Sequence, residues 1–170
     1  MKKTIDLSDK RIIISRTDSI GDVMLTLPIC HWIKSHFSNT TVIFLGRSYT
    51  VPILQSYTQI DEIVDWDSFS GIPTVEKTSK FRELNADVII HVFPNKDIAS
   101  LAKKVKVPVR VGTSHRSFHL LTCSIRLNFS RKNSNFHEAQ LNHELLKPFG
   151  LTELPSLENF NETTAFFQPN

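Results

Sequence analysis

A short polar loop at residues 16–22 carries the side chains of this sequence that are best suited to chemistry. It follows a β-branched run at residues 12–14, which predicts a strand buried on both faces. From Val23 onwards, apolar side chains recur at helical spacing. The loop is therefore expected at the carboxyl end of a strand, where open α/β sheets bind their ligands. Asp22 would present its carboxylate there, either to a ligand or to the first turn of the helix, as a capping residue.

Apolar runs recur along the chain at the spacing of a strand followed by a crossover helix. After the first strand we expect strands at 42–45, 63–66, 88–93 and 109–111, with one further candidate at 124–128. Helices are expected at 23–37, 49–57, 75–84, 98–105 and 136–149. This alternation predicts an α/β, Rossmann-like fold, in which a parallel sheet has helices on both faces.

Proline, glycine and polar segments indicate where these elements begin and end. Pro28 should kink the first helix or mark the start of its regular part, and Gly150 should end the last one. The basic stretch at 130–135 is interpreted as an exposed loop. Residues 1–150 then form one domain, and residues 151–170 a linker or tail without a further packed element.

The composition of the chain limits the classes of protein to which it can belong. The chain has 170 residues, a net charge of +3, 40% hydrophobic and 22% charged residues, as in a globular domain. Its basic residues are concentrated between Lys96 and Lys147, which favours an anionic partner. Two cysteines exclude a disulfide framework. No apolar run has the length of a membrane span or a secretion signal, so we expect a cytoplasmic protein.

The loop motif resembles that of a known family. Residues 16–23, RTDSIGDV, continued by TLP at 26–28, resemble the amino-terminal signature of glycosyltransferase family 9, the lipopolysaccharide heptosyltransferases. Residues 41–47 and 107–112 resemble its second and fifth strands. A further motif resembles the helix that closes the family's first domain: His137-Glu138 followed by Asn142, Leu145, Leu146 and Gly150. The resemblance covers residues 11 to 150.

This resemblance implies the amino-terminal half of a GT-B enzyme, whose two Rossmann-like domains face each other across a cleft. Residues 1–150 would be the acceptor-side domain, and the donor-binding second domain would be absent. The implied reaction is the inverting transfer of a heptose from a nucleotide-sugar, ADP-heptose, to a lipopolysaccharide core or another phosphorylated glycolipid acceptor. It needs no cofactor or metal, and this chain alone is expected to be inactive. The complete enzyme would contact the inner face of the inner membrane peripherally.

The resemblance also implies roles for the loop residues. Asp22 would be the catalytic base that takes the proton from the attacking sugar hydroxyl. Gly21 would let the backbone approach the sugar, although a simple tight turn also explains a glycine there. Ser19 and Thr17 would form hydrogen bonds with the oxygens of the sugar, although they could equally cap the helix. Asp18 departs from the small or hydroxyl residue of many family members.

Basic residues at strand ends are the candidates for binding the acceptor. Arginine suits phosphate because its planar fork binds two oxygens at once. Arg47, Arg116 and, more weakly, Lys96 follow strands, whereas Arg110 lies within one and could instead serve an ion pair that stabilises the fold.

Other functions remain open or are disfavoured. A non-catalytic module that binds an anionic glycolipid or a nucleotide is the main alternative. Nucleic-acid binding is not expected, because the basic residues are not interleaved with stacking aromatics. Asp65-Trp66-Asp67 has the form of a metal-binding motif of another transferase fold, but such acids are common in turns. The histidines lack the spacing of zinc ligands and are interpreted as surface or hydrogen-bonded residues.

Overall fold

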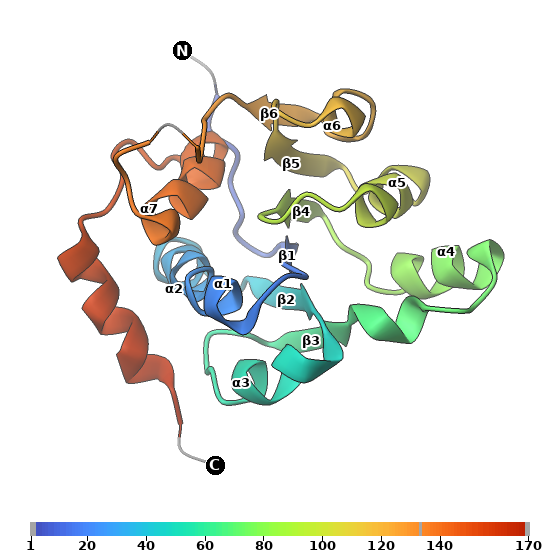
Figure 1. The fold of residues 1–170 in the computed structure, drawn as a ribbon, viewed down its shortest axis with the longest axis horizontal. Helices are drawn as coiled ribbons and strands as arrows, with labels where there is room; N and C mark the ends of the chain where they lie inside the picture. Colours follow the sequence, from blue (N-terminus) through green and yellow to red (C-terminus); the bar gives the residue numbers. More distant parts are fainter. Residues whose placement is uncertain (1–2, 133, 169–170) are drawn as a thin grey trace.

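The computed structural model describes residues 3–132 and 134–168, and within them six strands form one sheet (Figure 1). All the strand pairs are parallel, in the order β3-β2-β1-β4-β5-β6. The strands are β1 (Arg11–Ser15), β2 (Thr41–Gly46), β3 (Glu62–Asp65), β4 (Val88–His91), β5 (Val109–Thr113) and β6 (Ile125–Leu127). The predicted α/β Rossmann-like fold is therefore confirmed.

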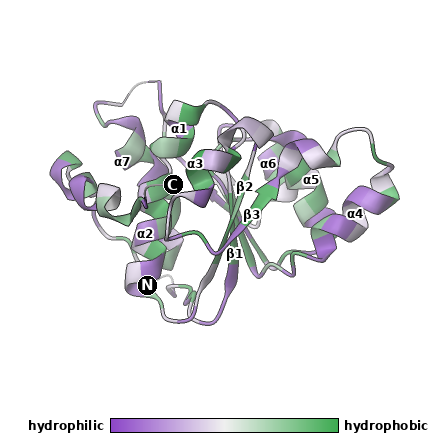
Figure 2. Cartoon of the chain, turned by 90° about the horizontal axis from the view of Figure 1, so that it is seen from below, coloured by the Kyte–Doolittle hydropathy of each residue, from purple (hydrophilic) through white to green (hydrophobic). Residues whose placement is uncertain are grey.

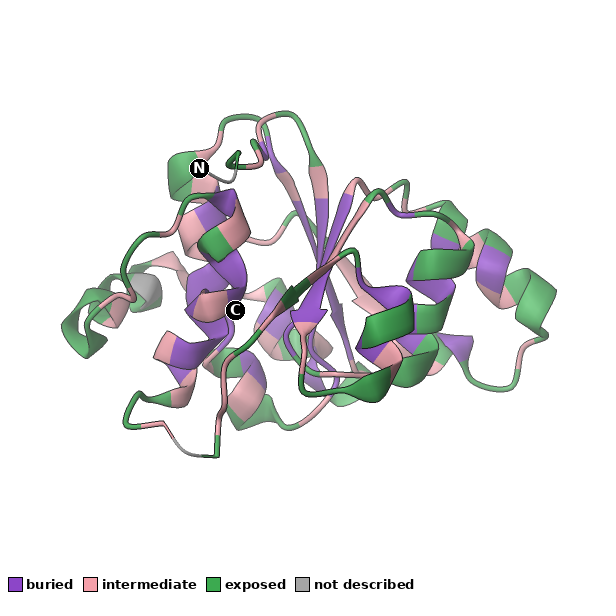
Figure 3. Ribbon diagram, turned by 90° about the horizontal axis from the view of Figure 1, so that it is seen from above, coloured by how far each residue is buried: buried purple, intermediate pink, exposed green. Residues whose placement is uncertain are grey.

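Helices cover both faces of this sheet (Figure 2). On one face lie α1 (Ile20–Met24), α2 (Leu27–His36), α3 (Val51–Gln55) and α7 (Glu138–Asn142); on the other lie α4 (Thr74–Arg82), α5 (Lys96–Lys104) and α6 (Ser117–Thr122). Side chains of β1 alternate between the two cores, with Ile12 and Ile14 in one and Ile13 in the other. The central strands are buried between the layers, as Figure 3 shows. This explains their continuous apolar sequence.

Three helical segments differ from the predicted ones by more than a shift of one or two residues at an end. The expected helix at 23–37 is divided into α1 and α2, and Pro28 lies in the first turn of α2, so it marks the start of the regular helix. The expected helix at 136–149 is α7 followed by the 3-10 helix η3 (His143–Phe149), which Gly150 ends in the left-handed conformation. Helix α6 was not predicted, because six residues are too few to show a helical period.

The expectation that residues 151–170 contain no packed element is wrong for the part described. Residues Leu157–Phe166 form the 3-10 helix η4, drawn in red in Figure 1. The ring of Phe166 lies 4.5 Å from that of His31 on α2, and Phe167 lies 5.0 Å from Tyr57. Aromatic packing therefore holds a segment whose sequence has no clear period. No helix in the described part of the chain is long and apolar enough to cross a membrane.

One buried histidine also departs from expectation. His91 ends β4 beside Ser15, is 1% exposed, and neither of its ring nitrogens has a hydrogen-bond partner among the described residues. Its ring lies 5.4 Å from that of His119, a buried residue of α6. Burial, followed by the charges of His119 and Arg110, lowers the pKa of His91 to about 3.

We therefore expect acid to destabilise the fold through His91. The unfolded chain binds a proton near pH 6.5 and the folded chain only near pH 3, so stability is lost as the pH falls through this interval. The loss should be about 2 kcal/mol between pH 7 and pH 5. Urea unfolding at several pH values should show a shallower dependence for His91→Leu than for the wild type. An unchanged slope would contradict this assignment.

Candidate functional site

A buried arginine organises the carboxyl edge of the sheet. Arg16 follows β1 directly, and its backbone amide donates to the carbonyl of Leu45, which extends the β1–β2 ladder. The side chain is 4% exposed, and its Nε and Nη2 both donate to the carboxylate of Asp18, at 2.7 and 2.9 Å. Nη2 also lies 3.1 Å from Oδ1 of Asp22. One guanidinium thus fixes both carboxylates of the loop, including the extra one that Asp18 introduces.

Helix α7 completes this cluster from the far end of the sequence. Nη1 of Arg16 lies 3.2 Å from Oε1 of Glu138 and 3.3 Å from Oδ1 of Asn142. Arg131 forms an ion pair with the same Glu138 and donates to the same oxygen of Asn142 at 2.9 Å. The amide of Asn142, which is fully buried, donates in turn to the carbonyl of Leu25. Two arginines therefore share one carboxylate and one amide.

Asp22 lies in the first turn of α1, three residues after the N-cap, and its carboxylate is partly exposed. Ser19 is the N-cap of α1, and its hydroxyl oxygen accepts from the backbone amide of Asp22 at 3.2 Å. The Ser19 hydroxyl also donates to Oδ2 of Asp22 at 2.6 Å. Asp22 thus belongs to the first turn of the helix, yet 36% of its side chain is exposed. Its carboxylate is fixed at both oxygens and still accessible to a ligand.

A cavity of about 510 Å³ opens beside this cluster at the carboxyl ends of β1, β4, β5 and β6. Arg16, Asp18 and Glu138 form one wall, and the turn after β5 contributes His115 and Arg116. The loop after β6 adds Arg131 and Lys132. The β1–β4 junction, where the strand order reverses, is the place at which open α/β sheets bind ligands. Asp22 does not line the cavity itself but is bonded to Arg16, which does.

The electrostatics of the cavity favour an anion. Arg131 is partly buried and close to Arg16, and burial together with the charge of Arg16 lowers its pKa to about 10. The guanidinium remains charged at neutral pH. Asp18, Asp22 and Glu138 already compensate Arg16 and Arg131, so Arg116 and Lys132 supply the further positive charge that an anionic ligand would meet in the cavity.

The structure brings together only some of the predicted substrate-binding residues. Arg116 lines the cavity, and Ser19 and Gly21 lie exposed at the start of α1, whereas Thr17 is 7% exposed. Lys96 is exposed at the start of α5 and does not line the cavity.

Arg47 and Arg110 serve the local structure. Arg47 forms a 2.6 Å ion pair with Asp67 on the β2–β3 side of the edge. Asp67 accepts a hydrogen bond from the backbone amide of Ser48, and Asp65 accepts one from the Ser48 hydroxyl. Arg110 donates to the carbonyls of Thr122 and Val107, away from the cavity. These placements do not favour either arginine as a ligand for the acceptor.

Three residues of the site were missed in the sequence. Arg131 belongs to the stretch interpreted as an exposed loop, although its Nη1 and Nη2 donate inward to Oδ1 of Asn142 and to the carbonyl of Val92. Glu138 and Asn142 were noticed only as part of a motif. Their separation of four residues places both on one helix face, and this was the signal that could have found them.

We expect Arg16 to stabilise the fold far more than an exposed arginine does. Arg16→Met would leave two or three carboxylates without their counter-ion and should lower the free energy of unfolding by about 2 to 3 kcal/mol. The matched change Arg47→Met removes an exposed ion pair and should cost less than about 1 kcal/mol. Urea denaturation of both variants tests this, and equal losses would contradict it.

Gly21 should be dispensable for folding. It lies in the first turn of α1, and a Cβ there would meet only the Ser19 hydroxyl, at 3.9 Å. Gly21→Ala should therefore raise the free energy of unfolding by about 0.5 to 1 kcal/mol. Gly112→Ala is the contrast, because its Cβ would meet Nδ1 of His119 at 2.6 Å and should destabilise the protein. Thermal unfolding compares the two, and a clear loss of stability in Gly21→Ala would show that the fold itself requires the glycine.

Solved structures of glycosyltransferases have a fold similar to that of this chain. No protein-family model and no curated protein matches the sequence. Among solved structures, the chain is similar to a family 9 glycosyltransferase from Veillonella parvula, with a TM-score of 0.72 and 23% identity over 88% of this chain and 44% of the other. It is also similar to the E. coli heptosyltransferase WaaC with ADP-2-deoxy-2-fluoro heptose, with a TM-score of 0.67 and 16% identity over 86% of this chain and 50% of the other.

A third solved structure, E. coli ADP-heptose lipopolysaccharide heptosyltransferase II, matches with a TM-score of 0.56 and 13% identity over 92% of this chain and 49% of the other. The chain thus spans about half the length of the structures that it matches. The likeness in fold agrees with the family resemblance of the loop motif. This chain has the fold of about one half of a family 9 glycosyltransferase.

Proposed function

We propose that this chain is the acceptor-binding part of a glycosyltransferase that transfers a heptose to an anionic saccharide. The observation that carries the proposal is the position of Asp22. Its carboxylate is held by the buried Arg16 at the carboxyl edge of the sheet, beside a cavity lined by Arg16, Arg116 and Arg131. A carboxylate next to a basic cavity is what a sugar acceptor with phosphate or carboxylate groups requires.

The proposed chemistry is an inverting displacement at the anomeric carbon of the nucleotide-sugar. The acceptor oxygen forms the new glycosidic bond while the bond to the nucleoside diphosphate breaks, and that diphosphate leaves with the electron pair. Asp22 accepts the proton of the attacking hydroxyl. A carboxylate does this only for a hydroxyl within hydrogen-bond reach that is already losing its proton in the transition state. The hydrogen bond from Ser19 and the ion pair with Arg16 restrict Asp22 to one orientation for this step.

The acceptor would be oriented by the basic side chains of the cavity. Arg116 and Lys132 are exposed at its rim, and Arg131 lies deeper, between Glu138 and the carbonyl of Val92. Paired N–H donors of arginine recognise phosphate and carboxylate groups by two parallel hydrogen bonds. A lipopolysaccharide core saccharide, which carries such groups, is the acceptor class that we propose.

The nucleotide-sugar would be bound mainly by residues outside this chain. The chain spans about half the length of the heptosyltransferase structures that it matches, one of which holds ADP-2-deoxy-2-fluoro heptose. The loop after β1 contains a single glycine and lacks the glycine-rich turn that cradles a dinucleotide. We therefore propose ADP-heptose as the donor and a second domain as the part that binds it.

Calorimetric titration of the purified chain tests this proposal. The ligands are ADP, ADP-heptose and a deacylated, Kdo-bearing phosphorylated saccharide, which lacks lipid chains and so reports on the cavity alone. We expect binding of the saccharide and little or no binding of either nucleotide. Arg116→Ala should weaken saccharide binding by about tenfold, the value of one charged hydrogen-bonded contact.

The matched control is Arg47→Ala, which removes an arginine from the same edge of the sheet but outside the cavity. It should bind the saccharide like the wild type. Tight nucleotide binding without saccharide binding would overturn the proposal. It would favour instead a non-catalytic module that binds nucleotides in this domain.

A further inference from the structure

Apolar residues form part of the lining of the cavity at the carboxyl edge of the sheet. Val92, Phe93 and Pro94 come from the loop after β4, and Phe129 comes from the loop after β6. The other residues that line the cavity are polar or charged. Ligand sites commonly combine an apolar surface with a few polar groups, and together these recognise a ligand that has both. The cavity is therefore suited to a ligand with an apolar face rather than to a simple inorganic anion.

Phe93 is the most accessible of these apolar side chains. Val92 is 1% exposed and Pro94 and Phe129 are partly buried, whereas 36% of Phe93 is exposed. An isolated exposed phenylalanine on a convex surface is ordinary. Phe93 differs because it lines a concave site, where its ring is open to whatever the cavity holds.

The backbone around Phe93 is fixed on both sides. The amides of Val92 and Phe93 both donate to the carbonyl of Ser15 at 3.1 Å, which ties the start of the loop to the end of β1. Pro94 follows with a restricted φ angle, and the side chain of Asn95 caps α5 by accepting two backbone amides. Phe93 is thus held in place before a ligand binds, and a preorganised contact costs less entropy on binding.

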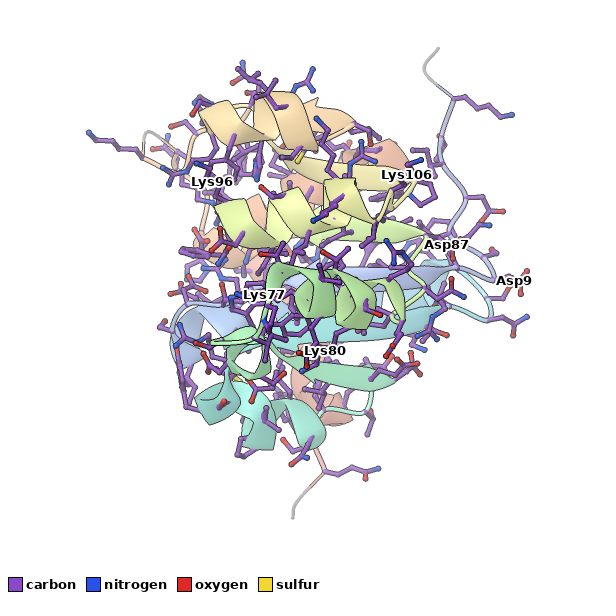
Figure 4. All side chains as sticks on the ribbon, turned by 90° about the vertical axis from the view of Figure 1, so that its right-hand side faces the viewer. Asp9, Lys77, Lys80, Asp87, Lys96 and Lys106 are labelled. Atoms are coloured by element: carbon purple, nitrogen blue, oxygen red, sulfur yellow. The ribbon has the colours of Figure 1, made fainter. Side chains whose placement is uncertain are left out.

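Figure 4 shows where this loop lies. Lys96, the first residue of α5, is at one end of that helix, and Lys106 is at the other end, together with Asp87, which precedes β4. The loop that joins β4 to α5 is therefore at the carboxyl edge of the sheet. This is the edge that also carries the loop of Asp22.

Carboxylates in the same cavity supply acceptors for hydroxyl groups. Asp18 and Glu138 both line it, with 20% and 26% of their side chains exposed. Both ion pairs of Glu138 are formed by Oε1, with Arg16 and Arg131, so Oε2 can accept a hydrogen bond from a ligand. An ionised carboxylate only accepts hydrogen bonds. These two side chains therefore favour a ligand that is rich in hydroxyl donors.

We infer that Phe93 determines the specificity of the cavity for a saccharide, by stacking against the apolar face of a pyranose ring. The C–H groups on one face of such a ring would lie over the π-electrons of Phe93, and a ring hydroxyl would donate to Glu138. Arg116 and Lys132, exposed at the rim, would bind the carboxylate or phosphate of the same sugar. This role rests on the proposed function, because it takes the cavity to be the acceptor site.

Calorimetry with the deacylated, Kdo-bearing phosphorylated saccharide tests this role of Phe93 in the whole chain. Phe93→Leu keeps an apolar side chain but removes the ring, and it should weaken binding about fivefold, the contribution of one aromatic contact. Phe93→Trp keeps an aromatic face and should bind the saccharide like the wild type.

The matched control is Phe136→Leu. Phe136 is 53% exposed, so its ring is also accessible, but it does not line the cavity. This variant should bind the saccharide like the wild type. Circular dichroism should show that the fold is retained in all three variants, because both rings are exposed at the surface. Equal losses in Phe93→Leu and Phe136→Leu would overturn the role of Phe93.

Inorganic phosphate separates a contact with the sugar from a general disturbance of the cavity. Phosphate has no apolar face, so its affinity, measured by displacement of the saccharide, should depend on Arg116 and not on Phe93. In NMR of the wild-type protein, saturation of the aromatic protons should transfer to the ring C–H protons of the bound saccharide, and Phe93→Leu should reduce this transfer. Equal weakening of phosphate and saccharide in Phe93→Leu would contradict a stacking contact.

Failure of this role and failure of the proposed function give different results. A wild-type chain that binds no saccharide would overturn both. Saccharide binding that is weakened by Arg116→Ala and unchanged in Phe93→Leu would overturn only the role of Phe93. The exposed ring would then belong to a contact with another part of the protein.

Discussion

The desolvated guanidinium of Arg16 is the interaction on which the rest of the site depends. A charge that is 4% exposed is stable only if anionic and polar groups replace the water that it has lost. Asp18 and Asp22 supply two of these groups from the same loop, and Glu138 and Asn142 supply the others from α7. Because this one charge must be compensated, the loop after β1 and helix α7, which lie far apart in the sequence, are held together.

This compensation also determines the form of the binding edge. Glu138 and Asn142 cannot reach Arg16 unless α7 packs next to α1, and the amide of Asn142 secures that contact through the carbonyl of Leu25. The same two residues bind Arg131 and hold the loop after β6 over the edge of the sheet. The cavity is bounded on this side because Arg131 of the loop is bonded to Glu138 and Asn142 of α7.

The net charge of the chain is small, but its basic and acidic residues are concentrated in different parts of the molecule. Basic residues are concentrated in the β4–β6 half of the sheet, whereas the segment beyond Gly150 that forms η4 carries three glutamates and lies against α2. The cavity and the turn at Arg116 both belong to the basic half. One side of the domain is therefore suited to anions, and the opposite side carries negative charge.

Much of the fold could be predicted because it depends on local patterns. Buried runs such as residues 12–14 and 42–45 are apolar on both faces, and this pattern fixes a strand in a covered parallel sheet whatever its neighbours are. Pro28 and Gly150 act through their own backbone restrictions, so the start of α2 and the end of η3 could be recognised from single residues. Helix α6 and η4 were not predicted, because short helices that are held by contacts with distant rings and strands need no helical period of apolar residues in their own sequence.

The candidate site likewise has one part that could be predicted from the sequence and another that could not. The sequence by itself determined that a polar loop with Asp22 follows the first strand, since strand, loop and helix are adjacent in the chain. Only the tertiary structure decided that Arg131, Glu138 and Asn142 meet Arg16 there, and that Arg110 faces carbonyl oxygens away from the cavity. A residue's type states which bonds it can form, but its partners across more than a hundred residues are chosen by strand order and helix packing, which no local pattern encodes.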